Sequence, residues 1–118
     1  MKPVPKYLLV AFQGEQMCFV HVLLNALDMH SRGLEVRIIM EGMATQLVTI
    51  LGYDSHAFAA LYNEVKAKGL VEGVCRACAT RTGAVESTEA QGLAFLSDIS
   101  GHPSLARYLQ NGWTVLTF

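Results

Sequence analysis

The sequence predicts a single α/β domain spanning residues 1–118: a three-layer sandwich with a mostly parallel sheet of about five strands and helices on both faces. Three observations favour this fold class. Short apolar segments alternate along the chain with helical patterns, as expected when helices connect parallel strands. A length of 118 residues is enough to bury the core of one domain. No repeat, linker or low-complexity tract divides the chain.

The first third of the chain predicts two strands separated by a helix. Lys6–Phe12 is a continuous apolar run, typical of a strand buried on both faces. A helix is expected over Gln16–Ser31 and should end at Gly33. Leu34–Met40 alternates apolar and charged residues, which predicts a strand at the edge of the sheet with one face partly wet. The helix is expected to present to the core Met17, Val20, Leu24 and Leu27, and to solvent His21, Asn25 and Asp28.

The middle of the chain predicts two helices and a third strand. A short helix is expected over Ala44–Leu51. A second helix should begin at Asp54 or Ser55, either of which can cap it, and run to about Lys68. The apolar segment Leu70–Cys75 then predicts the third strand.

The segment after the third strand predicts short elements. Ala77–Arg81 should form a helical turn. A helix is expected within Glu86–Leu96, with Ser87 as its N-cap, and a short fourth strand around Ala94–Ser97. These elements lead into the last part of the chain.

The last part of the chain predicts a helix and a terminal strand. Pro103 suits the first helical position, and Gly112 follows the end of the helix. Trp113–Phe118 predicts the final strand. The apolar stripe of this helix is expected to contain Leu105, Tyr108 and Leu109.

Composition narrows the classes of partner. Hydrophobic residues make up 52% of the chain and charged residues 16%, so part of the apolar surface is expected to face another subunit. Nine Lys and Arg against ten Asp and Glu leave no basic field for nucleic acid. No run offers the ~20 apolar residues of a membrane span, and the start lacks the pattern of a signal peptide. We therefore expect a cytoplasmic protein whose cysteines are not structural disulfides.

Cysteine placement points to sulfur chemistry. Cys75 and Cys78 form a C-x-x-C where the third strand meets a helical turn, and the carboxyl ends of parallel strands collect reactive groups, beside the point where the winding reverses. A helix N-terminus favours thiolate, so Cys75 is expected to have a lowered pKa; Cys78 fits either reaction or packing. Cys18 fits an inert buried residue. With flavodoxin-like winding, the first strand between the second and third, Cys18 would lie near the same crevice.

Other sites find less support in the residue pattern. Zinc within one chain is not expected, because the single C-x-x-C has no second pair of ligands, although two subunits could share a metal. His102 is an outside candidate for proton transfer, provided that its loop folds back. No glycine pattern indicates a nucleotide-binding site. An exposed C-x-x-C could also serve as a thiol–disulfide switch.

The segment GVCRACATRTGAV, together with KYLLVAFQG near the start and SGHPSLARYLQNGWTVLTF at the end, resembles the DsrE-like sulfur-relay family. The resemblance implies that Cys75 receives sulfur as a persulfide and passes it to a partner protein, without a cofactor. It also implies a homo-oligomer, as a dimer, trimer or hexamer. Cys78 departs from the simplest carriers, because it could attack a persulfide on Cys75 and leave a disulfide. The alternative is a non-catalytic assembly subunit whose cysteines are structural or hold a metal at an interface.

Overall fold

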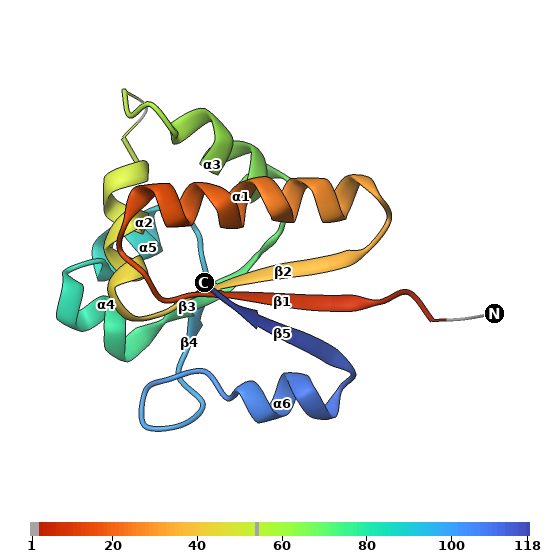
Figure 1. The fold of residues 1–118 in the computed structure, drawn as a ribbon. Coiled ribbons are helices and arrows are strands. Elements are labelled where there is room, and N and C mark those ends of the chain that lie inside the picture. The colour runs from red at the N-terminus through yellow and green to blue at the C-terminus, as the bar shows by residue number, and fades with distance from the viewer. Residues whose placement is uncertain (1–2, 54) are drawn as a thin grey trace.

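The computed structural model describes residues 3–53 and 55–118 and shows a three-layer α/β sandwich, which confirms the predicted fold class (Figure 1). The sheet has the strand order β4-β3-β2-β1-β5, and every pair of neighbouring strands is parallel. The short strand expected around Ala94–Ser97 is present. The strands are β1 (Lys6–Ala11), β2 (Glu35–Met40), β3 (Val71–Cys75), β4 (Phe95–Leu96) and β5 (Trp113–Thr117).

Helices cover both faces of the sheet. In Figure 1, α1, α2, α3 and α5 lie on one side of the strands and α6 lies on the other. Within the described ranges, no helix has the length and apolar character needed to cross a membrane. The helices are α1 (Gln16–Ser31), the 3₁₀ helix η1 (Gly42–Thr45), α2 (Gln46–Leu51), α3 (Ala59–Ala67), α4 (Arg76–Thr82), α5 (Val85–Ala90) and α6 (Leu105–Gln110).

The two faces of β1 bury different side chains. Leu9 joins the larger core, which includes residues of α1, α2 and α3, whereas Leu8 and Val10 join a smaller core with Tyr108 of α6. Successive side chains of a strand point to opposite faces, so a strand covered on both sides must be apolar at every position. This burial explains the uninterrupted apolar run at the start of the chain.

The position of β2 differs from the prediction. The sequence places the first strand between the second and third and puts the second at an edge, but β2 lies inside the sheet between β1 and β3. Glu35 and Arg37 are partly exposed on the face that holds Leu8 and Ile39. Helix α6 packs on this face but leaves the amino end of β2 accessible to solvent. The alternation of apolar and charged residues in β2 therefore resembles that of an edge strand, although β2 is a central strand.

Helix α1 has the predicted bounds but a different buried face. Met17 is 62% exposed and Leu24 is 49% exposed, although both were expected in the core. The apolar residues of α1 surround most of its circumference, so periodicity alone does not select the stripe that meets the sheet. The buried residues are Phe19, Val22, Leu23 and Ala26.

Three helix starts also differ from the prediction. Helix α3 begins at Ala59, well after Ser55; Asp54 lies outside the described residues. Helix α5 has Ala84, not Ser87, at its N-cap and ends at Ala90, before the chain enters β4. Helix α6 is capped by Ser104, whose Oγ accepts a hydrogen bond from the Arg107 N–H, so Pro103 precedes the cap. The observed helix starts thus differ from the predicted ones by two to four positions.

Gly73 permits the close approach of β4 to β3. A Cβ at this position would lie 2.7 Å from Leu96 Cγ and 2.9 Å from the Ala94 carbonyl oxygen. Any larger residue would therefore push the strands apart. This contact brings the segment that follows β4 close to the end of β3.

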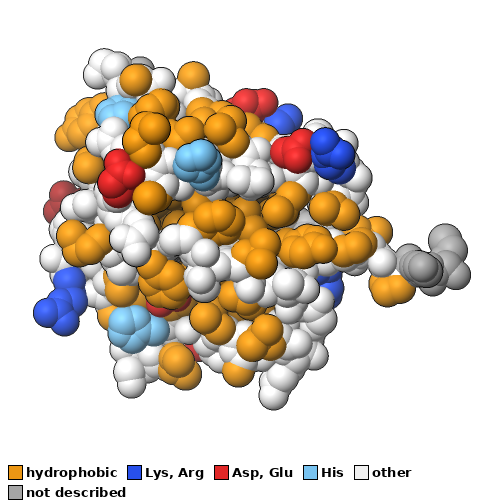
Figure 2. All heavy atoms as spheres, in the orientation of Figure 1, with side chains coloured by type: hydrophobic (Ala, Val, Ile, Leu, Met, Phe, Trp, Pro, Cys, Tyr) orange, Lys and Arg blue, Asp and Glu red, His pale blue; other side chains and the backbone are white. Residues whose placement is uncertain are grey.

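Apolar side chains also reach the surface. Figure 2 shows them over much of the face in view, with charged side chains mainly toward its rim. Scattered exposed apolar residues are normal, but contiguous ones are typical of contact surfaces. The exposed large apolar side chains of the described residues are Val4, Phe12, Met17, Leu24, Met43, Tyr53, Ile99 and Leu109.

Candidate functional site

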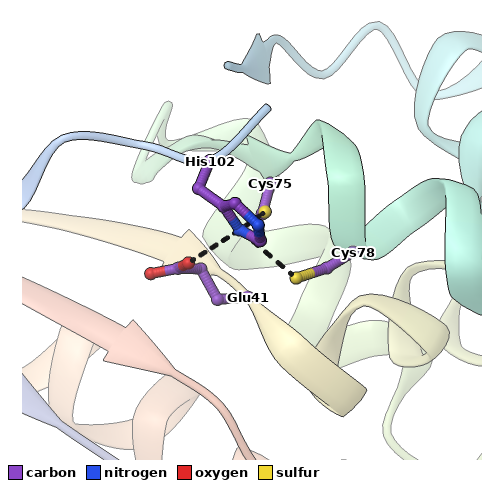
Figure 3. A group of neighbouring side chains, drawn as sticks. All are labelled: Glu41, Cys75, Cys78 and His102. Atoms are coloured by element: carbon purple, nitrogen blue, oxygen red, sulfur yellow. Dashed lines mark hydrogen bonds and ion pairs between the residues drawn. The ribbon is translucent and has the colours of Figure 1, made fainter. Parts of the chain in front are cut away.

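Four chemically active side chains meet at the carboxyl ends of β2, β3 and β4: Glu41, Cys75, Cys78 and His102 (Figure 3). Their ligand-type atoms all lie within 4.8 Å of one another. His102 Nδ1 lies 3.2 Å from Cys75 Sγ, 3.9 Å from Cys78 Sγ and 3.9 Å from Glu41 Oε1. The imidazole is therefore the common neighbour of both sulfurs and the carboxylate.

The strand order places Glu41 beside Cys75. Glu41 follows β2 directly, and its backbone N–H donates to the Ala11 carbonyl at 2.8 Å, which continues the sheet by one residue. Cys75 is the last residue of β3 and the N-cap of α4. Because β2 pairs with β3, the two side chains come from adjacent strand ends. Cys75 is 0% exposed and Glu41 is 8% exposed.

A tight turn carries His102 onto the sulfur of Cys75. Ile99 and His102 exchange two backbone hydrogen bonds of 2.8 Å, and Ser100 and Gly101 between them have φ values of 48° and 85°. Positive φ at both central positions is the property of a type I′ turn. The Gly101 carbonyl accepts the Ala77 N–H at 2.9 Å and lies 3.7 Å from Cys75 Sγ. The turn is thus anchored to α4 and covers Cys75.

Cys78 lies one helical turn beyond Cys75 and is partly exposed. Its carbonyl accepts a hydrogen bond from Thr82 Oγ1, which also lies 2.6 Å from Thr45 Oγ1 in η1. These hydroxyl contacts tie α4 to the segment that follows Glu41. Cys78 also lines a small, mostly apolar pocket of about 160 Å³, together with Gly42, Met43, Arg81 and Thr82. Of the two thiols, Cys78 is the one that solvent reaches.

The electrostatic setting of Cys75 opposes thiolate formation in the isolated chain. Burial raises the pKa of the Cys75 thiol to about 12, and the neighbouring Cys78 and Glu41 side chains act in the same direction. The backbone N–H of Cys78 acts against them and lowers this pKa. The expectation of a lowered pKa is therefore wrong for Cys75, because loss of hydration outweighs the helix N-terminus.

Glu41 carries a second buried ionisable group into the site. Burial raises the pKa of its carboxyl group, while the nearby His102 lowers it. Two sulfurs, an imidazole nitrogen and a carboxylate are together capable of proton transfer, thiol exchange and metal binding. The arrangement thus has the parts of a thiol site with its own base.

Cys18 is exposed, so the expectation that it is buried is wrong. It also lies outside this cluster, so the expectation that it lies near Cys75 is wrong as well. A hydrogen bond to Glu15 raises the pKa of the Cys18 thiol, with slight desolvation and the Glu15 charge adding to the effect. Cys18 lines a separate pocket of about 360 Å³ with His21, Asn25 and Phe118. The winding of the sheet reverses between β1 and β5, so this pocket, and not the Cys75 cluster, lies beside the reversal.

Three residues of the cluster agree with the sequence-based prediction. Cys75 and Cys78 are the predicted thiols, and the loop of His102 folds back onto them, the condition under which His102 is expected to take part. Glu41 is not predicted from the sequence, because the expected strand order separates β2 from β3. A carboxylate directly after a parallel strand is a signal that could have drawn attention to this residue.

Comparisons with known proteins agree with the fold. The "Uncharacterized protein MJ0733" of Methanocaldococcus jannaschii is 32% identical over 104 residues, which cover 88% of this chain and 83% of that protein. The solved structure of a conserved protein of unknown function, BT1422 from Bacteroides thetaiotaomicron, superposes with a TM-score of 0.65 at 20% identity, over 96% of this chain and 95% of that one. The sequence profile of the DsrE/DsrF-like family matches residues 17–118. The chain therefore belongs to the DsrE/DsrF-like family.

Proposed function

We propose that the protein is a sulfur-relay component that accepts sulfane sulfur as a persulfide on Cys75 and passes it to a partner protein. Membership of the DsrE/DsrF-like family supports a role in sulfur relay. The 3.2 Å contact between Cys75 Sγ and His102 Nδ1 carries the proposal, because it places a base against the thiol. An adjacent base activates a thiol whose surroundings otherwise keep it protonated.

Loading of Cys75 is a thiol exchange without net oxidation. His102 Nδ1 accepts the Cys75 proton, and the thiolate attacks the terminal sulfur of a donor persulfide, R–S–SH. A sulfur–sulfur bond to Cys75 forms as the donor bond breaks, and the donor leaves as a thiol after taking up the proton from His102. One sulfur–sulfur bond replaces another, so no oxidant is needed.

Release follows the same chemistry in the opposite direction. The thiolate of an acceptor protein attacks the outer sulfur, its new sulfur–sulfur bond forms, and Cys75 leaves as a thiolate that takes up a proton. The half-exposed His102, whose side chain is 44% accessible, connects the buried sulfur with the surface. We expect donor and acceptor to approach from this side, where a small opening of the turn at Gly101 uncovers Cys75 and leaves His102 within reach of the sulfur.

A thiol–disulfide switch is the second candidate, supported by the closeness of the two sulfurs. Cys75 Sγ and Cys78 Sγ lie within 4.8 Å of one another. The Cys78 thiolate could attack the inner sulfur of a Cys75 persulfide, expel HS⁻ and leave a Cys75–Cys78 disulfide. An external dithiol must then reduce the disulfide before another cycle. This route releases sulfide instead of delivering sulfur to a protein.

Partner proteins and self-association belong to the same proposal. Sulfur donor and acceptor proteins are required by the chemistry, and we propose that the chain works as a homo-oligomer, as its exposed apolar side chains suggest. The proposal also places the protein in the cytoplasm, where reducing conditions keep cysteines as free thiols, the form that its three cysteines have. Native mass spectrometry at two concentrations would count the subunits.

The test measures the intact mass of the metal-free, reduced chain after exposure to glutathione persulfide. The native chain and Cys18→Ser should gain about 32 Da per sulfur, removable by dithiothreitol, whereas Cys75→Ser should not. His102→Gln should load about 100-fold more slowly, since a positioned base contributes on this scale.

The outcomes separate the candidates. A reducible gain that persists in Cys75→Ser would place the sulfur on another residue and contradict the proposal. A loss of about 2 Da that requires both Cys75 and Cys78 would identify the disulfide route instead. Circular dichroism of each variant checks that the fold is retained.

A further inference from the structure

We propose that Glu41, Cys75, Cys78 and His102 of a single chain form a binding site for one Zn²⁺ ion. Two cysteine sulfurs, one imidazole nitrogen and one carboxylate oxygen are all established zinc ligands, and four is the usual number in a tetrahedral site. All four ligand atoms lie within 4.8 Å of one another. The C-x-x-C thus has its second pair of ligands in Glu41 and His102, which are distant in sequence.

The distances match a tetrahedral ion closely. Zinc–ligand bonds of about 2.0–2.3 Å place neighbouring ligand atoms roughly 3.3–3.8 Å apart. His102 Nδ1 lies 3.2 Å from Cys75 Sγ, and 3.9 Å from both Cys78 Sγ and Glu41 Oε1. No pair exceeds 4.8 Å, so shortening the longest separations by roughly 1.0–1.5 Å completes the shell.

The backbone holds each ligand before any ion arrives. The turn that bears His102 is closed by two hydrogen bonds and anchored through the Gly101 carbonyl to Ala77. Cys75 is held at the end of β3 as the N-cap of α4, Cys78 lies in the first turn of α4, and Glu41 is held by its backbone bond to Ala11. Ligands fixed by their supporting structure reduce the entropic cost of binding.

Figure 3 shows the four side chains pointing toward one another, with the His102 ring among the others. Cys75 and Glu41 are buried, whereas Cys78 and His102 are partly exposed. The open side gives an ion access, and the closed side excludes water from two of the ligands. Binding forms two zinc–sulfur bonds and releases the two thiol protons to solvent.

Zinc binding does not depend on sulfur transfer. A Cys75 sulfur bonded to zinc is not available to accept sulfur, so the zinc form and the persulfide form are alternative states of one chain. The chemistry also differs from a metal shared between two C-x-x-C pairs of a dimer, which would need neither Glu41 nor His102.

The experiment titrates the reduced, metal-free chain with Co²⁺ without oxygen and follows its absorption. The native chain should bind one Co²⁺ per chain, with the intense visible bands of a tetrahedral site and a thiolate-to-cobalt charge-transfer band; Zn²⁺ should displace it. Glu41→Gln and His102→Gln should each weaken binding by at least about 10–100-fold, because losing even an outer-shell partner of a ligand costs that much.

Cysteine variants provide the matched control. Cys78→Ser should reduce the charge-transfer band, whereas Cys18→Ser, which changes an exposed cysteine outside the cluster, should bind as the native chain does. One ion per two chains, no charge-transfer band, or equal affinity in Glu41→Gln and the native chain would each overturn the site. Because no sulfur donor is present, failure here leaves the persulfide experiment unaffected.

Discussion

His102 Nδ1 lies 3.2 Å from Cys75 Sγ, although 27 residues separate them in sequence. The same nitrogen lies 3.9 Å from Cys78 Sγ and 3.9 Å from Glu41 Oε1. The turn from Ile99 to His102 thus brings a base to the buried Cys75 thiol, shields the thiol from solvent and provides a possible second metal ligand. Three measurable consequences follow from the packing around this contact.

The three cysteines should react with iodoacetamide at very different rates in the folded, metal-free chain at pH 8. Cys18 is exposed, Cys78 is partly exposed and Cys75 is buried with a pKa raised to about 12. We expect Cys18 to react first, Cys78 next and Cys75 last, at least about tenfold more slowly than Cys18. Mass spectrometry of the peptides over time measures each rate.

The denatured chain is the control for this comparison. In guanidinium chloride the three rates should converge, because burial no longer protects Cys75. If Cys75 were the fastest cysteine in the folded chain, its thiol would be activated without a partner protein, and burial would not govern its reactivity.

Gly101→Ala should loosen the cover over Cys75. Gly101 has a φ of 85°, and an added Cβ would lie 3.0 Å from Ala77 Cβ. A side chain in the left-handed region costs about 1–2 kcal/mol, so the free energy of unfolding should fall by about that amount. The alkylation rate of Cys75 should rise, as the turn no longer rests on α4. Urea unfolding and the peptide assay measure the two effects.

Ser100→Gly is the matched control in the same turn. Ser100 already has a φ of 48°, a conformation that glycine adopts without strain. The free energy of unfolding of Ser100→Gly should stay within about 1 kcal/mol of that of the native chain. Cys75 should react with iodoacetamide as slowly as in the native chain. Equal protection of Cys75 in Gly101→Ala would show that the turn is not what covers the sulfur.

Alkaline pH should destabilise the metal-free chain through Cys75. Its pKa is raised from 9.0 to about 12 on folding, so the unfolded chain releases this proton first. The unfolded state binds fewer protons between these values, and the stabilisation present below pH 9 is lost as pH rises toward 12. Urea unfolding at pH 8, 9 and 10, with a chelator present, measures the slope.

Cys75→Ala removes the titrating group and should show a shallower decline over the same range. The buried Tyr62, whose pKa is also raised by burial, contributes equally to both proteins and cancels in the comparison. Identical slopes would mean that Cys75 does not keep its proton on folding.

Local sequence pattern was sufficient for most of the elements. The apolar run of β1, the bounds of α1 and the strand before Cys75 agree with prediction, because buried parallel strands and the helices between them leave strong local signals. The spacing of Cys75 and Cys78 likewise follows from residues within one helical turn. The sequence by itself therefore determined the α/β class and the closeness of the Cys75 and Cys78 side chains.

Tertiary structure alone decided the rest of the site. Strand order depends on how distant segments pack and not on the pattern within a strand, and it is this order that brings Glu41, not Cys18, to Cys75. The approach of His102 depends on a turn anchored to α4, and the buried face of α1 depends on which stripe meets the sheet. Burial then reversed the expected pKa shift of Cys75, because hydration is lost only when these segments close around the sulfur.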